Sequence, residues 1–478
     1  MDPWPALAQE LADRAVVTHR LQQLNAALTH RKHGDLGACT GHLFPPFFEQ
    51  SKAGRSPGLG SFVEAGDRDA NMVQSLEHGV PFSLLEFCPG RVRLGLRSGT
   101  LPRSCSLRGL GSGRSVIGSL FFPDVAAQGQ PGLLSVVLVH HYGADDLFRC
   151  VRALQEQEFR SLEIILVDNA SSDGAIALLE QERRRCAWTL PIKLVSRSLN
   201  DGFAAGVNAG LALCRGEFIL LLNPDTEVQT TALSALVGEL SRGADIVAPR
   251  LVLRDRPERL DNCGHRLFPD GLNWCRGRGE RAAGRYLEAE DVLLFSGAAV
   301  MFRRSALARI GALDDGFFAY GEDADLSLRA ARLGLRCRYL PEAVIAHRVG
   351  GSFGAFTLRK VFLVERNRVR VAITHLPRRW LLSAPLWTVA RFGVLALQGS
   401  RGQGLVGSFS LWQQALLPVT LLAASGASLL AVPGSLARRR GMARMVRAAG
   451  GLDDGRWAAL LRSHRVSLSE LARRPSGT

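Results

Sequence analysis

A cluster of acidic residues follows two aromatic residues and a flexible Tyr-Gly pair, within the stretch from Phe317 to Leu328. Glu322, Asp323 and Asp325 stand at the start of a run with helical character. Carboxylates are rarely buried beside aromatic side chains without a partner. A carboxylate in such a place is suited to take up a proton or to bind a cation. The segment therefore predicts one part of a catalytic site.

The three acids of this cluster are expected to differ in role. Carboxylates in the first turn of a helix interact favourably with the helix dipole, which is a purely structural reason for their presence. The same position favours the ionised form, which is ready to accept a proton. Adjacent residues of a helix point about 100° apart, so one of Glu322 and Asp323 is expected to face a substrate. Asp325 is expected to be a helix-surface or capping acid.

A further acid, Asp225, follows Asn223 and Pro224 at the end of the very apolar run 218–223. Proline restricts the turn and would direct the carboxylate toward the crevice beyond the strand. An oxygen ligand in that place suits Mg²⁺ or Mn²⁺ bound to a diphosphate. The structural alternative is an aspartate that caps the turn.

Three other positions are candidates for binding. Asp168 ends a second apolar run, where a carboxylate accepts hydrogen bonds from a nucleobase or a sugar hydroxyl; the alternative is a plain strand-to-helix turn. His347 follows an apolar run, and a lone histidine is more often structural than a ligand. Gly297 stands where a small residue admits a ligand, or where a hairpin turns.

Gly202, Gly206 and Gly210 are spaced by four residues. On one face of a helix this spacing allows a close approach of the backbone. The pattern differs from the G-x-G-x-x-G fingerprint of dinucleotide-binding proteins. Tight packing of a helix on a sheet is the structural alternative.

Alternating strands and helices are expected to position these residues. Continuous β-branched and apolar runs predict buried strands over 133–139, 162–168, 192–196 and 218–223, with helices over 147–159, 175–185 and 202–214. Such alternation is typical of α/β proteins with a parallel sheet, which bind ligands beyond the carboxyl ends of the strands. Asp168 and Asp225 both lie at such ends. Further strands are predicted over 245–253, 291–295, 299–302 and 336–340, and a helix over 323–333.

The basic charge of the chain belongs to its C-terminal part. The net charge is +15, and residues 359–478 contain 19 Lys+Arg against 4 Asp+Glu. Apolar stretches over 380–397 and 411–432 are flanked by arginines, which predicts amphipathic helices on an anionic membrane surface. One membrane span, or a helical bundle packed on the catalytic domain, is the alternative. No zinc-finger spacing or RNA-binding aromatic motif is present, so nucleic acid is not expected as a partner.

The remaining sequence carries less information. Residues 3–30 have helical periodicity and no signal-peptide pattern, whereas 31–130 alternate Gly/Ser/Arg-rich stretches with short apolar runs. The nine cysteines are scattered and odd in number, which favours reduced thiols in the cytoplasm. We expect an N-terminal extension over 1–130, a catalytic domain over 131–358 and a basic helical region over 359–478.

The order of motifs resembles glycosyltransferase family 2, in particular its bacterial rhamnosyltransferase-like branch. The segments, in chain order, are V-D-N-A-S-S-D, N-D-G-F-A-A-G-V-N-A-G, L-L-N-P-D-T, F-S-G-A-A-V-M-F-R-R, G-E-D-A-D-L and A-H-R-V-G-G-S. They fall within about residues 133–375. The resemblance implies the GT-A fold, an α/β fold with a mainly parallel, Rossmann-like sheet. It also implies inverting transfer from a nucleotide sugar.

The resemblance also implies roles for single residues. Asp168 matches the acid that contacts the nucleotide base, and Asn200 and Asn208 match polar positions around the donor, where Gly202 and Gly297 also lie. Asp225 matches the retained acid of the family's D-x-D metal motif, with Asn223 in place of the first acid. His347 matches a histidine that completes the Mg²⁺ or Mn²⁺ site. Asp323 matches the general base, and Glu322 is expected to orient the acceptor.

One departure concerns the first strand, which ends in His141-Tyr142 instead of the Tyr-Asn of this branch. The donor pocket is therefore expected to differ. dTDP-rhamnose is the first expectation for the donor, followed by UDP-galactofuranose or another UDP-hexose. The acceptor is expected to be a cell-envelope glycan or a lipid-linked sugar at the cytoplasmic face of the membrane.

Two other classes of protein were weighed against this one. A non-catalytic scaffold with the GT-A fold is the alternative, although the presence of all four of Asp168, Asp225, Asp323 and His347 disfavours it. A nucleotidyltransferase would need a glycine-rich, basic triphosphate loop after the first strand, and the sequence H-H-Y-G-A-D-D lacks one.

Overall fold

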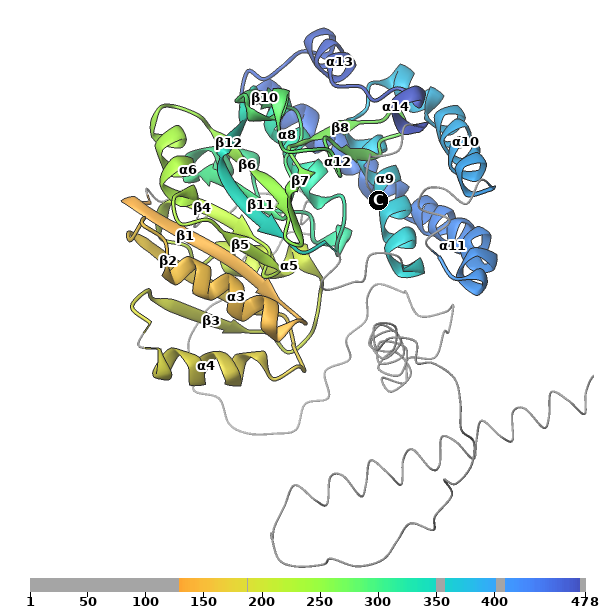
Figure 1. Ribbon diagram of the computed structural model, residues 1–478. Helices are drawn as coiled ribbons and strands as arrows, with labels where there is room; N and C mark the ends of the chain where they lie inside the picture. The colour runs from red at the N-terminus through yellow and green to blue at the C-terminus, as the bar shows by residue number, and fades with distance from the viewer. Residues whose placement is uncertain (1–128, 187, 350–356, 401–408, 473–478) are drawn as a thin grey trace, which may run out of the picture. The chain divides into compact units, whose positions relative to one another are not determined.

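The computed structural model describes residues 129–186, 188–349, 357–400 and 409–472 (Figure 1). These residues belong to one compact unit that begins at Leu107. The helix predicted over 3–30 and the rest of the N-terminal extension lie outside the described residues.

The first half of the unit has the predicted alternation of strands and helices. Its elements are β1 (Gln130–His140), α3 (Ala144–Gln155), β2 (Leu162–Asp168), α4 (Ala175–Arg185), β3 (Ile192–Ser196), α5 (Phe203–Leu211) and β4 (Gly216–Leu222). Strands β4, β1, β2 and β3 lie side by side in this order and are parallel, as predicted. Helix α3 begins and ends earlier than the predicted 147–159, because Gly143, with φ of 102°, starts it directly after β1.

The second half makes the sheet mixed. It contains β5 (Thr226–Val228), α6 (Ala232–Ser241), β6 (Ile246–Leu253), β7 (Arg256–Asn262), β10 (Glu290–Val292), β11 (Ala299–Arg303), α7 (Arg304–Ile310), α8 (Glu322–Arg332) and β12 (Cys337–His347), with the short ribbon β8 (His265–Leu267) and β9 (Asn273–Cys275). The main path of the sheet is β10-β12-β6-β11-β4-β1-β2-β3. Strand β11 is antiparallel to both β4 and β6, whereas β12 is parallel to β6. The mainly parallel pattern therefore applies to the first half, and antiparallel pairs dominate the second.

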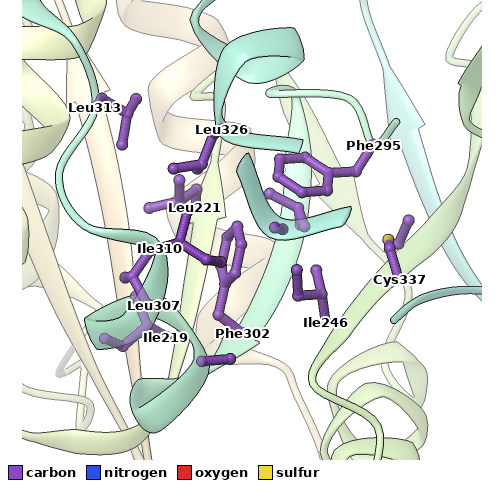
Figure 2. Packing of buried hydrophobic residues seen from close by; sticks show 14 of the residues in the cluster. Ile219, Leu221, Ile246, Phe295, Phe302, Leu307, Ile310, Leu313, Leu326 and Cys337 are labelled. Atoms are coloured by element: carbon purple, nitrogen blue, oxygen red, sulfur yellow. The ribbon is translucent and has the colours of Figure 1, made fainter. Parts of the chain in front are cut away.

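Hydrophobic clusters cover both faces of the sheet. One cluster includes Leu326 of α8, Phe302 of β11 and Ile310 of α7, and Figure 2 shows these side chains gathered together. The ring of Phe295 lies edge-on to that of Phe302, with centroids 5.3 Å apart. Because Leu326 is buried in this cluster, packing fixes the first turn of α8, where Glu322 and Asp323 lie.

The regularly spaced glycines serve packing. A Cβ atom on Gly206 would lie 2.6 Å from a methyl group of Val139, and one on Gly210 would lie 2.6 Å from a methyl group of Val137. Helix α5 therefore approaches β1 more closely than any larger residue would permit. Gly202 precedes the helix, has φ of 97°, and lies against the backbone of Phe318.

The C-terminal region is helical and packs against the sheet domain. Its elements are α9 (Leu358–His375), α10 (Arg378–Ser400), α11 (Leu411–Leu430), α12 (Val432–Ala448), α13 (Asp454–Ser463) and α14 (Leu468–Ala472). Helix α9 contacts α8, α10, α11 and α12. The buried Trp457 of α13 donates from its indole nitrogen to the His375 carbonyl at 2.9 Å. Two helices, Arg378–Gln398 and Leu411–Leu430, are long and apolar enough to cross a membrane.

Candidate active site

The carboxyl ends of β1 and β2 form one side of the site. Asp168 pairs in register with His140, is partly exposed, and accepts a hydrogen bond from the Ser171 backbone at 2.8 Å. Asp173 lies 3.2 Å from the buried His140 ring and accepts from the Gly143 backbone at 2.8 Å. These contacts fix the two loops beyond the strands, which is where a parallel sheet binds ligands.

The two predicted donor-side asparagines make contacts with the protein itself. The side-chain oxygen of Asn200 accepts from Asn169 at 2.9 Å and from the Gly202 backbone at 3.0 Å. Asn208 accepts from the Leu313 backbone at 3.0 Å and donates back to its carbonyl at 2.9 Å. Both asparagines thus stabilise turns around α5, and their contact with a donor stays a prediction.

Asp225 and His347 lie close together, one beyond the end of β4 and the other at the end of β12. Asp225 lies in the turn between β4 and β5, and β5 pairs antiparallel with the end of β12, where His347 lies opposite Thr226. One carboxylate oxygen of Asp225 lies 3.4 Å from Nε2 of His347. The Nδ1 atom of His347 lies 2.8 Å from a carboxylate oxygen of Asp261. Strand pairing therefore brings together two residues that the sequence predicted as a metal site.

This histidine is held between two carboxylates. Burial alone would lower the pKa of His347, but the nearby carboxylates of Asp225 and Asp261 raise it to about 10. For Asp261, burial raises the pKa and the hydrogen bond from His347 lowers it, with a net shift downward. The two carboxylates thus favour a positive charge on the ring of His347.

The donor set fits a divalent cation. The Oδ1 atom of Asp225 is buried and has no hydrogen-bond partner among the described residues. No group of three His, Cys, Asp or Glu side chains with metal-binding geometry occurs in the part of the chain that the structure describes. Asp225 and His347 would therefore supply two ligands, leaving other positions to water or phosphate oxygens, as Mg²⁺ often requires.

Asp323 is positioned by Gly297. One carboxylate oxygen of Asp323 accepts from the Gly297 backbone at 3.1 Å, and the other accepts from the Ala324 backbone at 2.8 Å. A Cβ atom on Gly297 would lie 3.4 Å from the Cβ atom of Asp323, which is van der Waals contact, so the two residues lie side by side. The glycine and the acid predicted from separate motifs thus belong to one contact.

Glu322 has different surroundings. It is buried, and its Oε2 atom lacks a hydrogen-bond partner within the described ranges of the chain. Burial, and then the neighbouring charge of Asp323, raise the pKa of Glu322 to about 8. Tyr320 lies within electrostatic reach of both Glu322 and Asp225, and its pKa is also raised, first by burial. The charges of Glu322 and Asp225 thus both act on Tyr320.

The loop that leads into α8 has an unusual backbone. Phe318 and Tyr320 have positive φ angles of 65° and 68°, and Gly321 follows at 91°. The fully buried amide of Asn367, in α9, donates to the carbonyls of Phe317, Ala319 and Tyr320 at 2.9, 2.9 and 2.6 Å. Strained backbone of this kind persists where the surrounding structure enforces it, and it is common at functional sites.

Asp325 differs from its predicted place at a helix surface. It is buried and accepts from Arg329 at 3.0 Å, and it lies 2.7 Å from Nε2 of His375. The expectation of a surface or capping acid was wrong because the C-terminal helices cover this side of α8. The ion pairs with Arg329 and His375 offset burial and hold the pKa of Asp325 far below its usual range.

Two residues of the site were missed in the sequence. Asp261 lies in the short, irregular strand β7, whose sequence shows no period of two. Asn367 lies inside helix α9, where asparagine is an unfavourable residue. That unfavourable position is a signal that could have identified Asn367.

Comparisons with known proteins agree with this arrangement. Residues 135–311 match the family model described as glycosyl transferase family 2. A pre-mycofactocin glycosyltransferase of Mycobacterium tuberculosis is 30% identical over 230 residues, which are 48% of this chain and 45% of the relative. An N-acetylglucosaminyl-diphospho-decaprenol L-rhamnosyltransferase of the same organism is 26% identical over 246 residues, 46% of this chain and 78% of the relative.

The match to the first of these relatives spans less than half of its length. Among solved structures, GalNAc-T7 with UDP, GalNAc and Mn²⁺ is similar with a TM-score of 0.42 and 14% identity, over 63% of this chain and 57% of that one. Residues 135–311 thus match the glycosyl transferase family 2 model, and the fold is of the GT-A type.

Proposed function

We propose that this protein is an inverting glycosyltransferase that moves a sugar from a nucleotide-sugar donor to an acceptor hydroxyl. The observation that carries this proposal is the pair Asp225 and His347 beyond the end of β4, together with the carboxylate of Asp323 held by the Gly297 backbone. The two parts are joined because the Asn223 backbone donates to the carbonyl of Ala298, the neighbour of Gly297, at 2.8 Å. The family match over 135–311 supports the reaction class.

In the proposed reaction, Asp168 contacts the base of the nucleotide at the end of β2. Asp225 and His347 bind a divalent cation, Mg²⁺ or Mn²⁺, which when bound neutralises charge on the leaving diphosphate. Asp323 accepts the proton of the acceptor hydroxyl, whose oxygen attacks C1 of the sugar from the side opposite the diphosphate. A single displacement inverts the anomeric centre and needs no covalent enzyme intermediate.

Rhamnose, carried by dTDP, is the first choice of donor sugar, and UDP-galactofuranose or another UDP-hexose is the second. The name of the mycobacterial rhamnosyltransferase supports rhamnose, and its decaprenol-linked sugar supports a lipid-linked or envelope-glycan acceptor. His141, which departs from the branch pattern, lies with Nδ1 3.1 Å from the Asn169 carbonyl. The neighbouring Tyr142 is 44% exposed and is available to a nucleobase.

The orientation of α10 supports a place on the cytoplasmic face of a membrane. Arg391, in the middle of α10, is only 2% exposed. It donates to Asp270 at 2.8 Å and to Glu365 at 2.8 Å, and Glu365 also accepts from Arg368 at 2.9 Å. This buried network ties α10 to α9 and to the β8–β9 turn, so α10 is not a free membrane span.

The outward side of α10 is apolar. Leu382, Leu386 and Val389 are 83%, 74% and 71% exposed, and α11 exposes Leu411, Trp412 and Leu422. In a helix at a protein–water surface, apolar side chains face the protein and charged side chains face the water. Helix α10 has the opposite arrangement, because its arginine is buried and its leucines are exposed. Arg378 and Arg379 stand at the start of α10, as suits a helix on an anionic lipid surface.

A nucleotide-release assay over a panel of nucleotide sugars, with Mg²⁺ or Mn²⁺ and crude lipid acceptor, tests the proposed reaction. Asp323→Asn should abolish transfer and leave donor binding near the wild-type level, because the amide accepts no proton. Asp225→Ala should lose cation-dependent donor binding. A wild-type protein that consumes none of the donors would instead favour the non-catalytic scaffold.

A further inference from the structure

Asp261 lies in β7 at an irregularity in the pairing of this strand with β6. Strand β7 pairs with β6 through Asn262 opposite Leu251 and Leu260 opposite Val252, so Asp261 is the extra residue of a β-bulge. Bulges redirect a side chain and are frequent beside active sites. Here the bulge directs the carboxylate of Asp261 to the ring of His347.

The contact has the geometry of a supported metal ligand. The Nδ1 atom of His347 lies 2.8 Å from Asp261, which leaves Nε2 directed at Asp225, 3.4 Å away. A histidine that binds a metal through one nitrogen almost always donates its other N–H to a carboxylate, carbonyl or water. Such a contact fixes the tautomer, holds the ring plane and increases the basicity of the ligating nitrogen.

A purely structural carboxylate would be unfavourable here. The side chain of Asp261 is only 4% exposed, and burial of a carboxylate is costly without compensation. Its other oxygen lies 3.2 Å from the guanidinium of Arg278, which is itself 39% exposed. Arg278 and His347 therefore stabilise the charge from two sides, and the chain Arg278–Asp261–His347 ends at the proposed cation position.

We propose that Asp261 is the positioning residue of the cation site and holds His347 in the ligating tautomer and orientation. This inference rests on the cation-binding part of the proposed function. Asp261 itself is no ligand, because its nearer oxygen is engaged by Nδ1 on the far side of the ring from Asp225.

Mn²⁺ binding to the full-length protein, measured by the spectroscopic signal of free Mn²⁺ with and without UDP, tests this role. Asp261→Ala should weaken Mn²⁺ binding by about 10- to 100-fold, the usual effect of removing such a carboxylate. Asp261→Asn should weaken it less, because its amide oxygen still accepts from Nδ1 but carries no charge. Asp225→Ala should have the largest effect.

Asp270→Asn is the matched control, since Asp270 is equally buried and ion-paired but belongs to the α10 network. Its Mn²⁺ affinity should equal that of the wild type, and thermal unfolding without metal reports any general loss of stability. Equal Mn²⁺ affinity in wild type and Asp261→Ala would overturn the role of Asp261 alone. A wild type that binds no Mn²⁺ would overturn the cation site and this role together.

Discussion

At the scale of single residues, Glu322 and Asp323 are neighbours with contrasting surroundings. Asp323 accepts two backbone hydrogen bonds, which stabilise its charge. Glu322 is buried without such support, and its pKa is raised to about 8. The backbone of the protein thus supports Asp323 as an anion. Glu322 is protonated near neutral pH and is then able to donate a hydrogen bond to a sugar oxygen.

Glu322→Gln should change the pH dependence of stability. A carboxyl whose pKa rises on folding contributes stability that is fully present below its unfolded value of about 4.5 and is lost as pH rises through about 8. Glutamine has no proton to lose. The variant should therefore gain on the wild type between pH 5 and pH 8, by at most about 1.4 kcal/mol for each pH unit.

Thermal unfolding of both proteins across this pH range measures the effect. Parallel stability curves would show that Glu322 does not carry the raised pKa. Gln181→Glu, on the exposed surface of α4, is the control, because its added carboxyl stays in water and should leave the pH dependence unchanged.

The sequence identified candidate site residues where they follow a strand-like apolar run. Asp225 and His347 each follow an apolar run, and the structure brings them together. Asp261 was out of reach because its contact with His347 depends on a bulge between β6 and β7, and bulges leave no period in the sequence. Asp325 was misplaced because its cover comes from a helix some fifty residues later in the chain.

At the scale of elements, helix α9 determines the path of the loop that precedes Asp323, the proposed general base. Asn367 satisfies three carbonyls of this loop, and Arg366 donates to the Phe317 carbonyl at 2.7 Å. The loop has no strand or helix partner for these groups. The position of Asp323 therefore depends on a helix that begins thirty-five residues later in the sequence.

Asn367→Ala should reduce transfer far more than donor binding. It would remove the side-chain donor to the Ala319 and Tyr320 carbonyls, at about 1–3 kcal/mol for each buried group that stays unsatisfied, whereas the Phe317 carbonyl keeps its bond from Arg366. Turnover at saturating substrate, donor affinity and thermal midpoint are the three measurements. Arg366→Ala, which removes a partly exposed donor to the same loop, should have a smaller effect of the same kind; a loss of donor binding instead would contradict the assignment of this loop to the acceptor side.

Gly206→Ala should destabilise the protein by about 1–3 kcal/mol, because the added methyl group overlaps Val139 of β1. Gly238→Ala in α6 is the matched control: a methyl group there meets no described heavy atom within 4 Å. That change should stabilise the helix by about 0.5–1 kcal/mol. Denaturant unfolding compares the two, and equal effects would contradict close packing of α5 on β1.

The elements themselves were predictable where they are long. The β-branched runs of β1, β2 and β4 identify strands buried on both faces, and their parallel order follows from the helices between them. Strands β5, β8 and β9 have three residues each, too few for any period to emerge. Strands β6, β10, β11 and β12 were predicted, but their antiparallel pairings were not, because the pattern within a strand does not show its direction beside a neighbour.

At the scale of the whole molecule, the C-terminal helices form the proposed membrane face. Replacing Leu382, Leu386 and Val389 together by glutamine should weaken binding to anionic vesicles at least about tenfold, since each side chain contributes burial in the lipid interface. Leu178→Gln, at an exposed leucine of α4, is the control and should leave binding unchanged. Cosedimentation with vesicles measures both, and equal binding by the triple variant would exclude α10 from the interface.

The sequence indicated two apolar helices and their arginines, but it left open which side of α10 faces the protein. That choice depends on Arg391, whose partners Asp270 and Glu365 come from different parts of the chain. Periodicity within α10 contains no information about them.

The pairing of β5 with the end of β12 also has a consequence for the order in which the protein folds during its synthesis. His347 lies 122 positions after Asp225, and the two meet only when β12 has been added beside β6. The parallel strands β1 to β4, by contrast, close over short loops and are complete long before β12 leaves the ribosome. A nascent chain would thus form β1 to β4 early, whereas the proposed cation-binding pair would come together only after His347 has been added.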